Sequence, residues 1–211
     1  MNSVRGEQTR KDVLQAAKQL FLTQGYGSTS MRNIAKAAGN LSVGSLYNHF
    51  ESKEQLFATL FQELSPHPLM LAAAETVQGE TAPDFIRHFL QKIIPIVLEH
   101  FAFVEMAQID AREFSGKNMT ILLEKYIPAF ALLFGKAQTL SGLKPIPPIV
   151  FLRFVAGSLL GFAFTHQFMP AQVRQLLTEE AWIEQFANFI LDGVATSAEP
   201  RHGVNDDHLN P

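Results

Sequence analysis

Apolar residues recur along this chain at spacings of three and four residues, which is the period of an amphipathic helix. In the first quarter the pattern predicts four short helices, near residues 9–23, 30–38, 42–50 and 52–64. Longer apolar segments follow at residues 68–78, 82–100, 102–114, 118–140, 147–168 and 178–196. No segment alternates convincingly between apolar and polar residues, so we expect no sheet. The pattern therefore predicts an all-α protein.

Small polar residues set the limits of the short helices. Thr29 or Ser30 can cap the second helix and Ser42 the third, because a side-chain oxygen accepts a hydrogen bond from a free backbone N–H group. Gly39 and Asn40 are expected to end the second helix, since these residue types enter left-handed conformations at the lowest cost. The resulting arrangement is a helix-turn-helix.

The helical pattern breaks at the stretch SPHP, which predicts a domain boundary. We expect a helix-turn-helix domain over residues 1–64 and a larger helical domain over residues 65–197. Pro95 and Pro128 are expected to kink or divide the helices that contain them, because proline removes a backbone donor. Residues 198–211 show no apolar periodicity and are predicted to be disordered.

Composition narrows the class of protein. Of 211 residues, 47% are hydrophobic and 18% charged, as in globular proteins, and the absence of cysteine excludes disulfides and thiolate metal sites. The first residues lack the apolar core of a signal peptide. The most apolar window, residues 154–165, is shorter than the about 20 residues that cross a membrane. We therefore expect a cytoplasmic protein without membrane contact.

The sequence offers no support for an enzyme. The motifs H-E-x-x-H, G-x-x-x-x-G-K-[ST] and G-x-S-x-G do not occur in it, and Glu-x-x-His occurs once, at residues 199–202, within the segment predicted to be disordered. These are the spacings that di-metal bundles, metalloproteases, P-loop enzymes and hydrolases require. We expect no catalytic activity, no metal and no cofactor.

Charge is distributed unevenly along the chain. Residues 1–50 carry six basic side chains against two acidic ones, and the remainder carries 11 against 18, within a formal net charge of −3. This asymmetry places any surface that binds a polyanion in the first quarter of the chain. Scattered, solvated charges on small helices would give the same totals.

A helical wheel over residues 42–50 separates two faces. Leu46 and Phe50 point inward, whereas Gly44 and Asn48 project outward as small polar groups that fit the major groove of DNA. Tyr47 and other flanking groups are suited to phosphates. The candidate DNA contacts are Arg10, in a loose basic arm, with Thr29, Ser30, Arg32, Val43, Gly44, Ser45, Tyr47, Asn48, His49 and Lys53. The alternative is a packing module that uses the same side chains as half-buried groups.

The run STSMRNIAKAAGNLSVGSLYNHFESKEQLF, residues 28–57, resembles the TetR/AcrR transcriptional regulators. The resemblance covers roughly residues 9–64 and lies in three elements: I-A-x-x-A-G, G-S-L-Y-x-H-F and S-K-E-x-L. Family members usually have one residue fewer between the first two elements. Asn40 is the extra residue here, and it can change the direction of the recognition helix.

A homodimer is expected, because helix-turn-helix proteins commonly pair to read two half-sites. The resemblance implies that the final two helices form the dimer, as a four-helix bundle. The candidate interface residues are Val155, Gly157, Ser158, Leu159, Gly161, Phe162, Trp182, Phe186, Phe189 and Ile190. An intramolecular core would use the same residue types.

The resemblance also implies an effector pocket in the larger domain, where aromatic residues are frequent. The candidate lining residues are Phe85, His88, Phe89, Phe101, Phe103, Glu105, Gln108, Arg112, Phe130, Phe134, Phe151 and Phe154. The alternative for the phenylalanines is an ordinary core, and for the polar residues an ordinary surface.

Taken together, these features predict a transcriptional repressor that binds an inverted-repeat DNA operator as a homodimer. A small apolar or aromatic effector would release it by preferring the conformation with poorly spaced DNA-reading heads. The alternative is a ligand carrier or helical scaffold without sequence-specific DNA binding.

Overall fold

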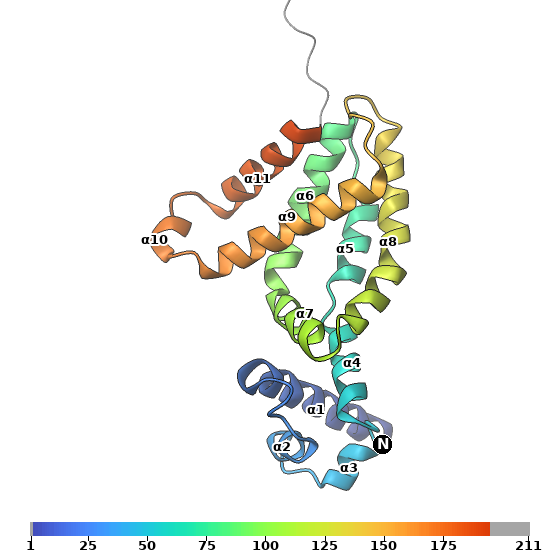
Figure 1. Ribbon diagram of the computed structural model, residues 1–211, viewed down its shortest axis with the longest axis vertical. Coiled ribbons are helices and arrows are strands. Elements are labelled where there is room, and N and C mark those ends of the chain that lie inside the picture. The colour runs from blue at the N-terminus through green and yellow to red at the C-terminus, as the bar shows by residue number, and fades with distance from the viewer. Residues whose placement is uncertain (1, 195–211) are drawn as a thin grey trace, which may run out of the picture.

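The computed structural model describes residues 2–194, and the side chains of residues 6–194. These residues form helices and no strand, which confirms the all-α prediction (Figure 1). The first four helices are α1 (Asn2–Gln24), α2 (Met31–Ala37), α3 (Val43–Tyr47) and α4 (Lys53–Glu63). They are followed by α5 (His67–Glu75), α6 (Ala82–Glu99), α7 (Phe101–Glu113), α8 (Lys117–Gln138), α9 (Pro148–Phe168), α10 (Ala171–Arg174) and α11 (Glu179–Val194). The predicted disordered tail, residues 198–211, lies outside the described residues.

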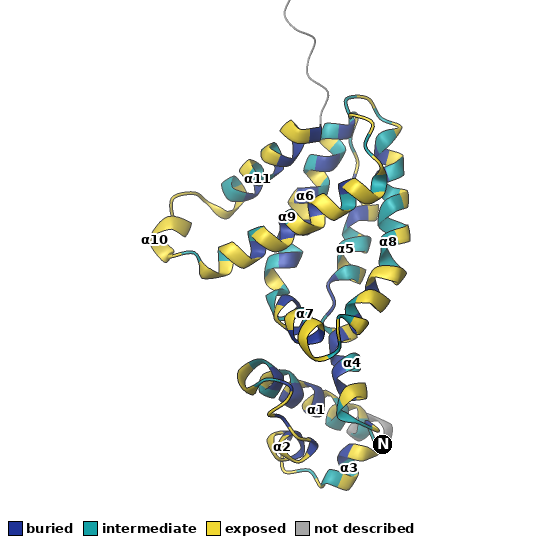
Figure 2. Cartoon of the chain, in the orientation of Figure 1, coloured by how far each residue is buried: buried dark blue, intermediate teal, exposed yellow. Residues whose placement is uncertain are grey.

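The small helices α1, α2 and α3 lie together at one end of the molecule, and α4 leads from them to the larger bundle (Figure 1). In that bundle α9 crosses the direction of α6 and α8, and α10 joins it to α11. The described surface of α9 and α10 is largely exposed (Figure 2). The molecule therefore has a narrow end made of short helices and a broad end made of long ones.

The predicted helix ends are largely confirmed. Ser30, and not Thr29, caps α2 by accepting a hydrogen bond from the Asn33 N–H group, and Ser42 caps α3. Gly39 and Asn40 adopt positive φ values of 91° and 58°, so both residues that end α2 are left-handed, as expected.

Three helical predictions differ from the structure. Helix α1 begins at Asn2, so no loose arm precedes residue 9. Pro95 and Pro128 were expected to kink or divide their helices, and division does not occur, because α6 and α8 run through them. Around Pro95 the buried side chains of Ile93 and Val97 hold both sides of the helix in the core, which offsets the lost backbone hydrogen bond. The stretch after Pro170, expected to be a loop, contains the single turn α10.

Two apolar cores stabilise the fold. The first is formed by α1 to α4 together with buried residues of α7 and α8, including Phe103, Met106 and Leu122. The second is formed by α6, α8, α9 and α11. The predicted domain boundary at residue 64 lies in the turn between α4 and α5, but the first core extends across it. The short helices are thus held on the larger bundle by shared apolar packing.

The first turn of α8 is fixed by a buried carboxylate. Asp110, in α7, is 0% exposed. Its Oδ1 accepts hydrogen bonds from the Asn118 Nδ2 at 2.7 Å and the Asn118 backbone N–H at 3.3 Å, and its Oδ2 accepts one from the Met119 N–H at 2.9 Å. These N–H groups have no partner within their own helix. Asp110 therefore acts as a remote cap that joins α7 to α8.

Candidate nucleic-acid interface and internal cavity

Helix α3 presents a small polar surface to solvent. The helix ends at Tyr47, earlier than the predicted residue 50. Leu46 of α3 and Phe50, three residues after the helix end, are 0% and 2% exposed, so both point inward as predicted. Gly44 and Asn48 are exposed on the other side, and Tyr47 is 50% exposed. The Ser42 Oγ accepts a hydrogen bond from the Ser45 N–H at 3.0 Å, so the helix start is fixed. An exposed short helix of this kind can enter a major groove.

The turn between α2 and α3 contains Asn40, the residue predicted to be an insertion. The Asn40 N–H donates to the Lys36 carbonyl at 3.1 Å, and the Leu41 N–H donates to the Ala35 carbonyl at 2.9 Å. The turn therefore closes back onto the end of α2 and holds α3 firmly in place. Val43, Ser45 and His49 are half-buried on its flanks, and the His49 ring lies beside Gly6 of α1.

Lys53 makes contacts within the unit formed by α1 to α4, called the short-helix unit below. Its Nζ donates hydrogen bonds to the carbonyl oxygens of Tyr26 and Thr29, at 2.9 and 2.8 Å. The same ammonium group lies 3.9 Å from the centre of the Tyr26 ring, within the range of a cation–π interaction. These contacts tie the loop after α1 to the start of α4. A structural role for Lys53 was not evident in the sequence.

Two other predicted phosphate contacts are also engaged within the protein. Arg10 pairs with Glu63 at 2.7 Å and lies over the Phe50 ring at 5.6 Å. Thr29 is buried, and its hydroxyl donates to the Gly25 carbonyl at 2.9 Å. Arg32, by contrast, is exposed at the start of α2, close in sequence to the capping residue Ser30 that the prediction also included.

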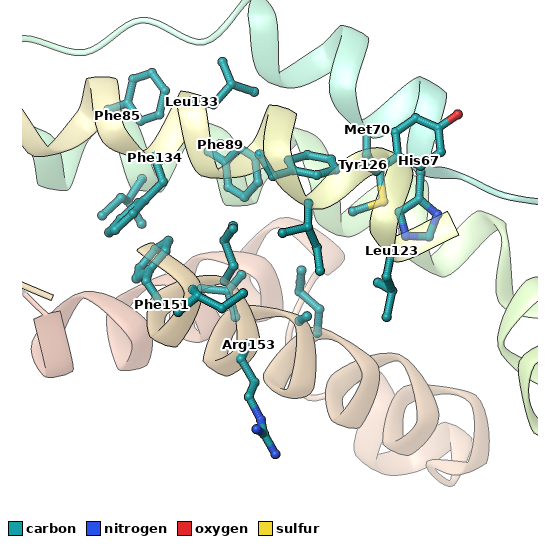
Figure 3. A pocket seen from close by; sticks show the side chains of 18 residues that line it. His67, Met70, Phe85, Phe89, Leu123, Tyr126, Leu133, Phe134, Phe151 and Arg153 are labelled. Carbon is teal, nitrogen blue, oxygen red and sulfur yellow. The ribbon is translucent and has the colours of Figure 1, made fainter. Parts of the chain in front are cut away.

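The larger bundle contains a cavity of about 490 Å³ that is partly open to solvent (Figure 3). Helices α5, α6, α8 and α9 line it, almost entirely with apolar side chains. This volume falls within the range of small-molecule sites in proteins, about 300–1,000 Å³. Five of the predicted effector residues line it: Phe85, Phe89, Phe130, Phe134 and Phe151.

The other predicted effector residues lie elsewhere. Phe103 is buried in the first core, against Phe61 of α4, and Phe101 packs against the second core. Phe154 is exposed on α9. The four polar candidates are exposed and do not line the cavity: His88, Glu105, Gln108 and Arg112.

The sequence interpretation missed several lining residues. His67 and Met70 of α5 and Leu123 and Tyr126 of α8 lie together at one end of the cavity (Figure 3). A signal for those on α8 was present, because apolar residues recur there at helical spacing from Leu123 to Phe134. No pattern marked His67, which stands between two prolines in the predicted boundary.

His67 connects several parts of the structure. Its Nδ1 lies 2.8 Å from the Ser65 Oγ. Its ring stacks on Tyr126 at 5.3 Å and meets Phe103 edge-on at 5.6 Å. Burial lowers the pKa of His67 below its usual value of 6.5, because the charged form loses hydration. The imidazole is therefore neutral at pH 7.

Helices α9 and α11 combine an inner apolar face with an outer one. Of the predicted interface residues, Val155, Leu159 and Ile190 are buried within the protomer. Ser158, Phe162, Trp182 and Phe186 are half-buried, whereas Gly157 and Gly161 are exposed and Phe189 is 79% exposed. Further exposed apolar side chains continue this surface along α9: Phe154, Leu160, Phe164 and Phe168.

By length and composition α9 could also cross a membrane, and 22% of its most apolar window is buried in the protein. A helix covered by protein on both sides meets the same criterion. Its inner face packs in the second core, through Val155, Leu159 and Ala163. The outer face is exposed in the described chain.

Sequence comparison relates the short-helix unit to known proteins. Residues 13–60 match the family described as bacterial regulatory proteins, tetR family. The chain is 43% identical over 56 residues to the HTH-type transcriptional regulator AcrR of Shigella flexneri. It is 44% identical over 54 residues to the HTH-type transcriptional repressor KstR2 of Mycolicibacterium smegmatis. Each alignment covers 26% of this chain and 26% of the relative, so the chain matches about a quarter of the length of these relatives.

Structural similarity extends over the larger bundle. A bacterial regulatory protein in the tetR family from Rhodococcus RHA1 is similar with a TM-score of 0.69, over 90% of this chain and 98% of that chain. The two sequences are 19% identical. At this level of identity the similarity concerns the fold.

Proposed function

This chain belongs to the tetR family of bacterial regulatory proteins, and we propose that it is a transcriptional repressor that binds an inverted-repeat DNA operator as a homodimer. A small apolar or aromatic effector releases it from the operator. The observation that carries the proposal is α3, a short capped helix with a buried apolar side and a small polar outer side. The repressor role is supported by the relative KstR2, which is named a transcriptional repressor. The site of action is the cytoplasm.

On this proposal the DNA contacts divide into two groups. Gly44, Ser45 and Asn48 face base edges, with Val43 on a thymine methyl group, because α3 is narrow enough for the major groove. Tyr47, His49 and Arg32 contact phosphates on the two sides of the major groove. Ser30 places the first turn of α2 beside one of these phosphates. Arg10, Thr29 and Lys53 act indirectly, since their polar groups bind within the protein.

The homodimer is proposed to form through α9 and α11. Aromatic side chains along the outer face of α9, and Phe189 on α11, are too apolar to be left in water without cost. Gly157 and Gly161 have open space around their Cα atoms, which allows a second helix to approach closely. Phe154, Phe164 and Phe168 join the predicted interface residues on this surface.

Mass measurement tests the dimer. At micromolar concentration the wild-type protein should have twice the 23.5 kDa mass of one chain by light scattering. Phe189→Glu should shift it to the monomer mass, because a buried unpaired charge is costly. Leu69→Glu is the matched control, since Leu69 is exposed on α5. A monomeric wild type would contradict the dimer.

Selection of bound fragments from randomised duplex DNA tests the regulator itself, at a salt concentration of about 0.15 M. We expect one inverted repeat. Asn48→Ala should relax the selected sequence at one base pair of each half-site, by about 1–3 kcal/mol, whereas Gln62→Ala, an exposed change on α4, should not. Recovery of no motif, with binding that fades as salt rises, would favour the carrier or scaffold.

A further inference from the structure

The cavity extends along α8. His67 and Leu123 lie at one end of its lining, and Phe134 and Phe151 at the other (Figure 3). From Leu123 to Phe134 the helix α8 advances about 16 Å, at 1.5 Å per residue. A volume of about 490 Å³ holds on the order of 15 groups the size of a water molecule, at about 30 Å³ each. The shape favours one extended molecule over a compact one.

The cavity is also electrically neutral. Besides His67, only Tyr126 and Arg153 bring polar side-chain atoms to the lining. Figure 3 shows the Tyr126 oxygen at the outer edge of the group and the Arg153 guanidinium extending away from it. An ionised ligand group would lose its hydration here without gaining a charged partner. The neutral imidazole of His67 supplies no positive charge either.

His67 offers one free polar atom. Its Nδ1 is engaged with the Ser65 Oγ at 2.8 Å. Its Nε2 makes no hydrogen bond within residues 6–194, and it is not sealed from solvent, since the only fully buried unpartnered side-chain polar atom in that range is the Tyr26 hydroxyl. Solvent water can satisfy this atom, and a ligand that displaces the water must supply the same hydrogen bond. A ligand hydroxyl or carbonyl at this end of the cavity would supply one.

The His67 ring also lies close to the packing between α7 and α4. His67 contacts Phe103 edge-on, and Phe103 lies 4.9 Å from Phe61 of α4, between ring centres. Phe61 in turn stacks on Phe57, next to the Tyr26 loop that Lys53 holds. The His67 ring is therefore in contact with the packing that positions helices α1 to α4.

We propose that the cavity binds an elongated, uncharged apolar molecule whose single polar end hydrogen-bonds to the Nε2 of His67, and that this contact transmits binding to α4. The inference rests on the proposed function and specifies the chemical class of its effector. His67 is both the anchor of the ligand and the positioning residue for α4. Ligands without a polar end still fill the cavity but act on α4 weakly.

Equilibrium dialysis of the full-length protein tests the anchor, with 1-decanol, decane and decanoate as probes at pH 7.5. The wild type should bind 1-decanol at least about tenfold more tightly than decanoate, because the carboxylate must be desolvated. His67→Phe keeps an aromatic ring against Tyr126 but removes the polar atom. This variant should bind 1-decanol about fivefold more weakly than the wild type does, which is the range of one hydrogen bond. Its affinity for decane should change less than twofold.

His88→Phe is the matched control, because His88 is an exposed histidine of α6 outside the cavity, and it should alter none of these affinities. The proposal is overturned if decanoate binds as tightly as 1-decanol. It is also overturned if the wild type does not bind 1-decanol, or if His67→Phe weakens decane as much as the alcohol.

Binding to the selected duplex tests the coupling. Saturating 1-decanol should weaken duplex binding by the wild type at least about fivefold, as in typical allosteric coupling, and decane should weaken it less. In His67→Phe the ratio of the duplex affinities measured without and with 1-decanol should fall toward one. A wild type that binds both duplex and alcohol independently overturns the coupling. A wild type that binds the alcohol but no duplex would instead overturn the proposed function and leave the anchor standing.

Discussion

Replacing Lys53 with methionine distinguishes a structural contact from a DNA contact. Methionine keeps much of the apolar stem of lysine but removes the ammonium group. In the structure that group donates to the Tyr26 and Thr29 carbonyls and lies over the Tyr26 ring. Removing it leaves two loop carbonyls without their donor and frees the loop from α4. We therefore expect a loss of stability in the absence of DNA.

The magnitude follows from these contacts. Hydrogen bonds to charged groups contribute about 1.5–3 kcal/mol each, and a partly exposed cation–π contact about 0.5–1 kcal/mol. Lys53 is half-buried, so water replaces part of the loss. The free energy of unfolding should fall by about 2 kcal/mol, which lowers Tm by roughly 4–8 °C for a chain of this size.

Urea unfolding and duplex binding at several salt concentrations provide the assay. Lys36→Met is the control, because Lys36 is an exposed lysine of α2; its stability should change by less than about 0.5 kcal/mol. If Lys53 bound a phosphate instead, Lys53→Met would be as stable as the wild type. Its salt dependence of binding would then fall by about one unit of slope. That combination would refute the structural role.

Three further predictions concern stability. Asp110→Ala should lower the free energy of unfolding by about 3 kcal/mol in urea titration, because it removes the remote cap of α8; Asp110→Asn should lose less. Tyr26→Phe should raise the free energy of unfolding by about 1 kcal/mol, measured as a higher urea midpoint at an unchanged m-value, since the buried Tyr26 hydroxyl has no partner; a lower midpoint would contradict this. Burial lowers the pKa of His67, so the unfolded chain binds the proton more tightly, and the stability that the neutral ring provides is complete above about pH 7 and is lost as pH falls below 6.5. His67→Gln should show a smaller decrease between pH 7 and pH 5, and an identical pH profile would refute the assignment.

Local sequence signals predicted the short helices well. The caps at Ser30 and Ser42 and the left-handed pair Gly39 and Asn40 act over three or four residues, so the sequence contains both partners of each contact. The apolar period likewise predicted that Leu46 would face inward. Such features require no knowledge of which helices meet in space.

Long-range contacts were beyond that kind of prediction. Lys53 binds carbonyl groups 27 and 24 residues away, and a basic residue beside a recognition helix is equally typical of a phosphate contact. The aromatic residues of the larger bundle were ambiguous for a similar reason. Phe103 and Phe134 have the same local pattern, but only the packing of α7 on α4 and of α8 on α9 places Phe103 in the first core and Phe134 where the second core meets the cavity.

The shared core constrains how a ligand can act on DNA binding. Phe57 and Phe61 of α4 are buried together with Phe103 and Met106 of α7, so α4 cannot move independently of the bundle without opening a densely packed region. A ligand that binds with the same affinity in each orientation of α4 shifts nothing. Only a contact that differs between the two orientations can shift them. His67 lies where the cavity and this core meet, so a bond to its imidazole can differ in that way.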